Sequence, residues 1–382
     1  WVARMIMATM YFKNEIPFKN VYFTSTIRDG KGRKLSKSLG NSPDPLNIFE
    51  KYGTDANRFT IIYLSPLGQD VKMDVDVKAQ DIPSMEIGRN FANKIWNAGR
   101  FLLMKSKSEG LNDCCPTNVN KILNSDELTF SDKWILSRLN STIKNIHWAL
   151  DNYKVNEYSK LLYDFIWRDF CDWYVEIIKV QLSISDSPSY KQALMKHVVY
   201  LYEQILKLLH PIMPFITEEI WHLLEDRKDE ESISLQRIPD ADEKLIDNAL
   251  EEKFFNLQLL VEEIRRLRAS INLPPQQKLP VVISSKSEEE KTFIFDKSDI
   301  IKAMANCSSV NTEISISKPA NCLASVVRET EIFLMLEGSV DISKEKERLN
   351  KEKERLQNNI IATERKLNNE KFISNASPEI VK

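Results

Sequence analysis

The sequence predicts a mostly α-helical protein, α+β overall, on three observations. Through the middle of the chain apolar residues recur at spacings of three and four, as in Leu194, Val198, Leu201, Ile205 and Leu208. Short β-prone runs occur only on the two flanks of this region. Seven of the nine glycines precede residue 101, so loops that need unusual backbone angles are concentrated in the first quarter.

Composition limits the classes of function. The 53 basic and 55 acidic residues give a net charge of −2, which excludes a uniformly basic nucleic-acid binder and leaves local patches as the route to such contacts. No apolar run approaches the roughly 18 residues of a membrane span. Five cysteines without paired spacing favour a reducing, cytoplasmic compartment. Cys114 and Cys115 are adjacent, which is not a metal-ligand spacing, so we expect no metal site.

The first region, residues 1–84, is predicted to be the C-terminal part of an α/β domain, which the family resemblance given below implies is of the Rossmann type. Val21–Thr24 is β-prone and predicts a strand, and a polar, basic loop follows from Arg28 to Asn41. Pro43-Asp44-Pro45 then leads into a helix near Leu46–Tyr52. Because the chain begins at Trp1 inside an apolar run, we expect it to be a piece of a longer protein.

Residues 85–275 are predicted to form a helical bundle of several amphipathic helices. Pro211 and Pro214 interrupt the helical pattern, and Thr217-Glu218-Glu219 supports a new helix that runs to about Glu225. Pro274-Pro275 ends the last bundle helix.

Residues 276–340 are predicted to form a small α/β subdomain around a helix near Ser298–Ala305. Its expected strands are Leu279–Ile283, Phe293–Phe295, Asn311–Ile316 and Ile332–Leu336.

Residues 341–382 are predicted to begin a coiled-coil arm. Ile342, Leu349, Leu356 and Thr363 recur every seven residues, and nine basic and seven acidic residues lie between 341 and 371. Ser377-Pro378-Glu379 opens a second helix. From composition alone, a homodimerisation zipper is an alternative.

The basic loop carries the strongest chemical signal. It combines three glycines and two serines with five cations, which are Arg28, Lys31, Arg33, Lys34 and Lys37. Mobile lysines and backbone amides of this kind suit polyphosphate, whose charge grows as pyrophosphate leaves. The alternative is a solvated basic loop, which is the usual meaning of such a cluster.

The complete sequence of the loop favours the phosphate-binding interpretation over a solvated loop. Lys34-Leu35-Ser36-Lys37-Ser38, followed by Leu39-Gly40-Asn41, resembles the KMSKS signature of class I aminoacyl-tRNA synthetases, with Leu35 in place of methionine. The resemblance implies that Lys34, Ser36, Lys37 and Ser38 bind ATP, that Lys34 and Lys37 are catalytic, and that Mg²⁺ accompanies the ATP. Asp55 and Arg58, in the segment that follows, are expected to hold local structure.

Further segments resemble the valyl-tRNA synthetase family. They are Trp1–Met7, Gly68–Lys72, Arg89–Ala98, Phe170–Glu176 and Leu273–Pro275, together with the arm. The resemblance implies a valine–tRNA ligase whose bundle binds the anticodon of tRNA(Val), with Lys94 and Phe101 as the main tRNA-binding candidates and Arg89 and Asn90 as weaker ones. It also implies that the arm is half of an antiparallel hairpin that contacts tRNA. Phe101 has the alternative of being a core aromatic.

Two rival classes stay open, an isoleucyl- or leucyl-tRNA synthetase and a non-catalytic tRNA-binding or coiled-coil protein. The resemblance places the HIGH signature, most of the valine pocket and the editing domain upstream of Trp1. We therefore expect this chain alone to be inactive in valine activation, and the whole enzyme to be cytoplasmic and monomeric.

Overall fold

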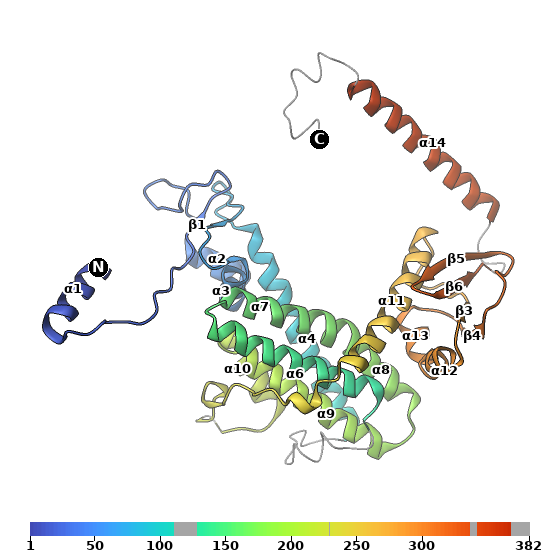
Figure 1. Ribbon diagram of the computed structural model, residues 1–382, viewed down its shortest axis with the longest axis horizontal. Coiled ribbons are helices and arrows are strands. Elements are labelled where there is room, and N and C mark those ends of the chain that lie inside the picture. The colour runs from blue at the N-terminus through green and yellow to red at the C-terminus, as the bar shows by residue number, and fades with distance from the viewer. Residues whose placement is uncertain (111–127, 229, 337–341, 368–382) are drawn as a thin grey trace. The chain divides into compact units, whose positions relative to one another are not determined.

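The computed structural model describes residues 1–110, 128–228, 230–336 and 342–367, and it confirms the mostly helical fold with small sheets (Figure 1). The chain divides into two compact units, residues 1–254 and residues 255–382. Each unit is described by itself. Within the described residues, no helix is long and apolar enough to cross a membrane.

Unit 1 begins with a small α/β element. Its parts are α1 (Val2–Lys13), β1 (Ile27–Arg28), α2 (Pro45–Tyr52), α3 (Thr54–Leu64) and β2 (Val71–Lys72). β1 and β2 pair in parallel, with Ile27 opposite Val71, so α2 and α3 form the crossover that parallel strands require. The predicted helix at residues 46–52 is confirmed as α2, and Asp44 caps it by accepting a hydrogen bond from the Leu46 amide at 3.0 Å.

The strand predicted at Val21–Thr24 is wrong. That segment is exposed and outside any strand, and pairing begins three residues later at Ile27. β-Propensity alone misplaced it, because the position of the strand is set by the partner backbone at Val71.

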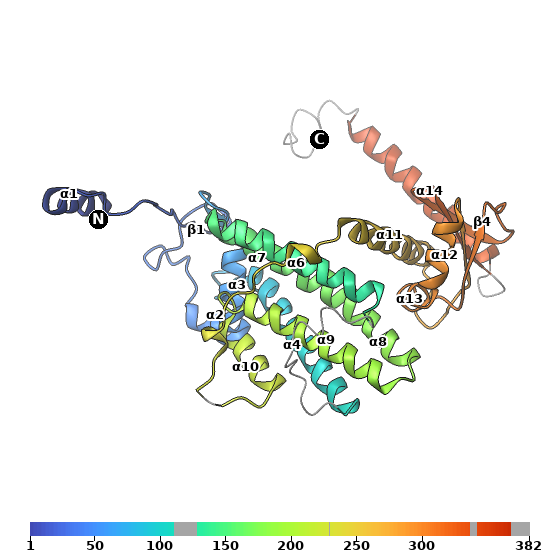
Figure 2. The ribbon, with the colours of Figure 1, turned by 60° about the horizontal axis from the view of Figure 1, so that its bottom comes forward.

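The bundle of unit 1 is built from long helices that lie alongside one another (Figure 2). They are α4 (Glu86–Ser108), α6 (Phe130–Asp151), α7 (Val155–Asp164), α8 (Val175–Ile184), α9 (Pro188–Leu209), α10 (Pro214–Leu224) and the start of α11 (Asn248–Ser270), with short 3₁₀ turns at Pro83–Met85, Ile233–Leu235 and Glu243–Leu245. The predicted helical region and its interruption between Pro211 and Pro214 are confirmed.

Between α7 and α8 the chain forms a π-helix over Phe165–Tyr174. Phe170 and Tyr174 are fully buried and belong to the core of the bundle. From the same segment Asp169 accepts a hydrogen bond from Arg138 Nε at 2.9 Å, and Arg138 also donates to Glu251. The segment thus supplies both core aromatics and polar groups aimed at neighbouring helices.

A close approach of α3 to α4 depends on Gly88. Its amide donates to Thr60 Oγ1 at 3.1 Å, and a Cβ at this position would lie 2.1 Å from the carbonyl oxygen of Ala56. Any side chain here would force the helices apart, so the glycine fixes how the first element joins the bundle.

Asp55 and Arg58 on α3 bind the turn between α9 and α10. The Asp55 carboxylate accepts hydrogen bonds from Phe215 N at 3.4 Å and Ile216 N at 2.7 Å, which are amides of the first turn of α10. Arg58 donates to the carbonyl oxygens of Ile212 and Pro211 at 3.0 and 3.1 Å. Burial raises the pKa of Asp55, and the two amide hydrogen bonds oppose that shift.

These contacts correct the expectation that Asp55 and Arg58 hold local structure. Their partners lie more than 150 residues away in the sequence. Met213, at the N-cap of α10, makes no side-chain cap of its own, so Asp55 supplies the missing acceptor from a distant helix.

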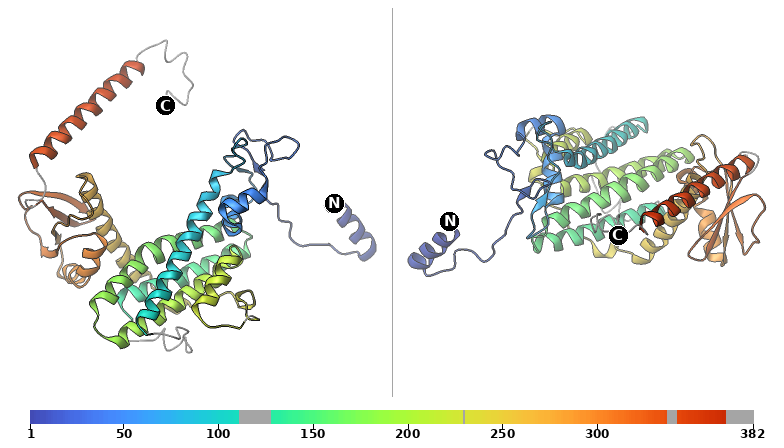
Figure 3. Two further views of the ribbon diagram at one scale, coloured as in Figure 1. Left: turned by 180° about the vertical axis from the view of Figure 1, so that it is seen from behind. Right: turned by 90° about the horizontal axis from the view of Figure 1, so that it is seen from above.

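Unit 2 contains a four-stranded sheet in the order β4-β3-β6-β5, seen from two further sides in Figure 3. Its elements are β3 (Val281–Ser285), α12 (Glu288–Asp296), α13 (Ser298–Met304), β4 (Val310–Ile314), β5 (Cys322–Val327) and β6 (Thr330–Met335). β3 pairs in parallel with β4 and antiparallel with β6, and α12 and α13 make the crossover. The predicted helix at residues 298–305 is confirmed.

One strand prediction in this unit is wrong, and one strand of the sheet has no prediction. Phe293–Phe295 lies inside α12, which Ser287 caps by accepting from Glu290 N at 3.2 Å and whose first turn carries three glutamates. β5 was not predicted, because it joins β6 through a two-residue turn with positive φ at Arg328 and lacks the usual glycine.

The described part of the arm is helical and forms α14 (Ile342–Leu367). Leu356 and Ile360 are half-exposed or more. The predicted second helix from Ser377 lies outside the described residues, and pairing of α14 in a coiled coil stays a prediction.

We expect Asp55→Ala to destabilise the chain by about 1–2 kcal/mol, because two first-turn amides of α10 lose their acceptor. Thermal unfolding of the 382-residue chain measures this loss. Glu50→Ala, which removes an exposed acid from α2, serves as the control and should change stability by less than about 0.5 kcal/mol. Equal melting temperatures for the two variants would contradict the capping role.

Candidate functional site

The basic loop is organised around the buried carboxylate of Asp29. Its Oδ1 accepts hydrogen bonds from the Lys31 and Arg33 amides at 3.1 and 2.9 Å. Its Oδ2 accepts from Arg33 Nε at 2.9 Å and from Asn41 Nδ2 at 3.0 Å. The hydrogen bond from Asn41, aided by those from Arg33, holds the pKa of Asp29 far below its usual range. The loop is therefore built on a permanent negative charge.

Asn41, at the end of the loop, binds the backbone of the signature at Lys34 and Ser36. Its side chain is 1% exposed; Nδ2 donates to the carbonyl oxygen of Lys34 at 3.2 Å as well as to Asp29, and Oδ1 accepts from the Ser36 amide at 2.9 Å. The next residue back, Gly40, has φ +62°, a conformation that favours glycine. One side chain thus fixes the backbone on both sides of Leu35.

The predicted catalytic lysines project from this scaffold into solvent. Lys34 and Lys37 are exposed, and neither side chain has an ion-pair or hydrogen-bond partner among the residues that the structure describes. Ser36 Oγ and Ser38 Oγ lie 2.7 Å apart. The structure therefore brings all four predicted ATP-binding residues together on one short loop, with two unpaired cations and two hydroxyls available to an anion.

β1, the strand that leads into the loop, is bound by the side chain of Asp70. Arg28 Nε donates to Asp70 Oδ2 at 2.5 Å, and the Thr26 amide donates to Asp70 Oδ1 at 3.1 Å. The hydrogen bond from Arg28 lowers the pKa of Asp70. Of the loop's five cations, Arg28 and Arg33 are paired with Asp70 and Asp29 and stabilise the loop. The lysine side chains are not part of these pairs, so their charges can bind an anion.

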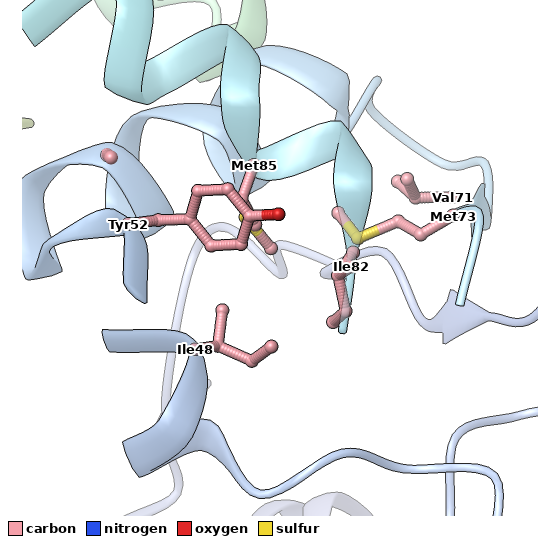
Figure 4. Packing of buried hydrophobic residues seen from close by; sticks show 7 residues of the cluster. Ile48, Tyr52, Val71, Met73, Ile82 and Met85 are labelled. Atoms are coloured by element: carbon pink, nitrogen blue, oxygen red, sulfur yellow. The ribbon is translucent and has the colours of Figure 1, made fainter. Parts of the chain in front are cut away.

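A small apolar core supports this scaffold. Side chains converge on it from α2, β2 and the segment before α4 (Figure 4); they include Ile48, Tyr52, Val71, Met73, Ile82 and Met85. Beside it lies a pocket of about 640 Å³, lined by parts of the same core together with Lys34, Leu35, Ser42 and Phe49. The loop therefore borders a largely apolar hollow.

The four predicted tRNA-binding residues all lie on α4. Asn90, Lys94 and Phe101 share one face of the helix. Lys94 forms an ion pair with Asp172, and Lys179 Nζ lies 5.4 Å from the centre of the Phe101 ring. Arg89 turns away and pairs with Glu86 at 3.3 Å. Phe101 is half-buried, so it is neither a full core residue nor fully exposed.

Sequence reasoning missed Asp29, Asn41 and Asp70. Asp29-Gly30 is a recognisable turn signal and marks Asp29 as a turn residue. No local signal links Asn41 to Asp29 or Asp70 to Arg28, because these hydrogen bonds cross 12 and 42 residues.

Metal-ligand side chains do not gather at the loop or elsewhere among the described residues. Across the described part of the chain, no group of three or more His, Cys, Asp or Glu side chains is placed to hold a metal ion. Cys114 and Cys115 lie outside the described residues, and Cys171 and Cys307 are buried free thiols.

Three family models match the chain. Residues 1–74 match tRNA synthetases class I (I, L, M and V), residues 132–283 match the anticodon-binding domain of tRNA ligase, and residues 341–382 match the valyl tRNA synthetase tRNA binding arm. With the lysine-bearing signature loop and the helical bundle, these matches define a class I aminoacyl-tRNA synthetase.

Curated relatives narrow the class. Valine–tRNA ligases of Chlorobaculum tepidum, Fusobacterium nucleatum and Thermotoga maritima are 42%, 39% and 38% identical to the chain over its whole length. The chain belongs to the valyl-tRNA synthetase family. It spans about two fifths of the length of these relatives, covering 42%, 41% and 41% of them.

We expect Asn41→Ala to loosen the signature loop, because the Ser36 amide and the Lys34 carbonyl lose their buried partners, at a cost of about 1–3 kcal/mol. Limited trypsin digestion of the chain should cut after Lys34 and Lys37 roughly ten- to a hundredfold faster. Asn47→Ala, an exposed position on α2, is the matched control. Unchanged cleavage in Asn41→Ala would show that Asn41 does not hold the loop.

Proposed function

We propose that this chain is part of an enzyme that activates valine with ATP and transfers it to tRNA(Val). The observation that supports this most directly is the pair of exposed, unpartnered lysines on a rigid signature loop, in a chain aligned throughout with valine–tRNA ligases. In the first step the valine carboxylate attacks the α-phosphorus of ATP and pyrophosphate leaves. In the second, a 3′-terminal ribose hydroxyl of tRNA attacks the valyl carbonyl and AMP leaves.

The contribution of the loop is electrostatic. Negative charge increases on the β- and γ-phosphates as pyrophosphate departs, and Lys34 and Lys37 would neutralise it while Ser36 and Ser38 donate hydrogen bonds. The scaffold of Asp29 and Asn41 holds these groups in place before the reaction, so little reorganisation is needed. Mg²⁺ would accompany ATP, with phosphate oxygens of ATP as its ligands.

The bundle would bind the anticodon of tRNA(Val). Lys94 offers a cation and Phe101 an aromatic face on the same side of α4, which suits unstacked bases on a charged backbone; Arg89 and Asn90 are further candidates. We place the whole enzyme in the cytoplasm as a monomer, with α14 contacting tRNA. The proposed domain limits are residues 1–84, 85–275, 276–340 and 341–382.

Replacing the corresponding 42% of the Chlorobaculum tepidum relative with this chain tests the loop. The chimera should catalyse valine-dependent ATP–pyrophosphate exchange, and Lys34→Ala or Lys37→Ala should slow it roughly 10²-fold, because each removes charge stabilisation in the transition state. Lys78→Ala, an exposed lysine outside the loop, is the control. Full exchange activity in both loop variants would refute their catalytic role.

Binding by the 382-residue chain tests the bundle. It should bind tRNA(Val) transcripts more tightly than tRNA(Ile) or tRNA(Leu). Lys94→Ala should weaken binding and lower the slope of log Kd against log salt by about one, because one phosphate contact is lost. The exposed Lys133 on α6 provides the matched charge removal. Equal effects of the two substitutions would argue against a specific contact at Lys94.

A further inference from the structure

Two groups of side chains with the same composition lie along α4 and the π-helix–α8 segment. In the first triad, Lys94 Nζ lies 4.9 Å from the centre of the Trp167 ring and forms an ion pair with Asp172. In the second triad, Lys179 Nζ lies 5.4 Å from the Phe101 ring centre and 2.6 Å from Glu176 Oε1. Each triad is an aromatic ring, a lysine and a carboxylate.

The π-helix presents the first triad. Phe170 and Tyr174 are fully buried, whereas Asp172 keeps 43% of its side chain exposed and Trp167 is half-buried with one face stacked on Tyr163 at 5.4 Å. A π-helix is uncommon and is frequently associated with function, because its wider turn re-aims side chains. Here it directs Asp172 toward Lys94 on a separate helix.

The two triads have a spacing suited to separated nucleotides. Lys94 and Phe101 are seven residues apart on α4, which is about 10 Å at 1.5 Å per residue. Adjacent stacked bases are only about 3.4 Å apart, so triads at this spacing can engage neighbouring nucleotides only where their bases are splayed from one another. Single-stranded loops present such bases, and duplexes do not.

We propose that Asp172 and Glu176 are base-reading residues, each accepting a hydrogen bond from the exocyclic amino group of an unstacked cytosine or adenine. A carboxylate is an acceptor only, and this pairing is the one it makes with base edges. Lys94 and Lys179 release their carboxylates to bind the adjacent phosphates, which vacates the Trp167 and Phe101 rings for stacking. This inference rests on the proposed anticodon function and adds the residues that would select bases.

A third triad supplies a control. Lys154 Nζ lies 4.4 Å from the Trp148 ring centre and 3.3 Å from Glu157 Oε1. Lys154 lies in the turn that joins α6 to α7, where its amide donates to the carbonyl of Ala149 at 2.7 Å, and Trp148 and Glu157 lie on the two helices on either side. The same chemistry here stabilises a local turn, so Glu157→Gln removes an equivalent charge without touching the α4 surface.

The sign of one substitution tests the proposal. Asp172→Asn removes a negative charge near an anionic ligand, so if Asp172 only anchors Lys94, the chain should bind tRNA(Val) more tightly. If Asp172 accepts a base amino group, binding should weaken about tenfold with an unchanged salt slope, because the neutral amide oxygen of asparagine accepts more weakly than a carboxylate. Fluorescence anisotropy of labelled tRNA(Val) with the 382-residue chain measures both quantities. Glu157→Gln should leave the affinity within about twofold.

A base scan makes the test specific. Each adenine or cytosine of the anticodon loop is replaced in turn by uracil, and one replacement should cost the wild-type chain about tenfold while costing Asp172→Asn much less. Unchanged or tighter binding by Asp172→Asn, or equal penalties in both proteins at every position, would overturn the proposal. If Asp172→Asn does not fold, as judged by loss of its thermal unfolding transition, Glu176→Gln is tested in its place. Glu176→Gln should also weaken tRNA binding, and the base that it no longer reads should lie at a different position of the anticodon loop.

Binding by the wild-type chain distinguishes failure of the proposed function from failure of the base-reading proposal alone. If the wild-type chain binds tRNA(Val) no better than other tRNAs, the anticodon assignment fails and the base-reading proposal fails with it. If the wild-type chain is selective and only the Asp172 and Glu176 variants behave as structural, the function stands and this inference falls.

Discussion

The arrangement of unit 1 depends on the charges that α3 places against the turn between α9 and α10. Asp55 occupies the amide end of α10 and Arg58 binds carbonyl oxygens of the turn before it, so each charge meets the backbone dipoles of opposite sign. Both residues directly follow the helix that leaves the signature loop. The loop and the bundle therefore share one rigid support, with Gly88 allowing α4 to pack at close range.

The loop itself separates structural charge from available charge. Asp29 and Asp70 take up the two arginines, and Asn41 ties the backbone around Leu35, which leaves Lys34 and Lys37 without partners among the described residues. A lysine already paired with a carboxylate would have to break that contact before it met a phosphate. A preorganised, unpaired lysine avoids this cost, which is the physical basis for assigning chemistry to these two positions.

On the bundle, in contrast to the loop, the lysines considered for nucleic-acid binding are paired with carboxylates. Lys94 and Lys179 are paired with carboxylates and lie over aromatic rings, so the surface presents both charge signs and two ring faces on neighbouring helices. Such a surface gives selectivity more readily than raw affinity, because an anionic ligand must compete for the lysines and also satisfy the carboxylates. A net charge of −2 likewise leaves local patches as the route to any nucleic-acid contact.

The sequence by itself determined the helical bundle, the α2 helix, the interruption at Pro211 and Pro214, and the loop that carries Lys34 and Lys37, because periodicity, proline and a short motif are local signals. It misplaced the strand at Val21–Thr24, made a strand of Phe293–Phe295 and left out β5, because a strand exists only where a partner backbone meets it. Only the tertiary structure joined Asp29 to Asn41, Asp55 to α10 and Asp172 to Lys94. Those contacts form between side chains far apart in the chain, and no local pattern encodes which distant group a carboxylate will meet.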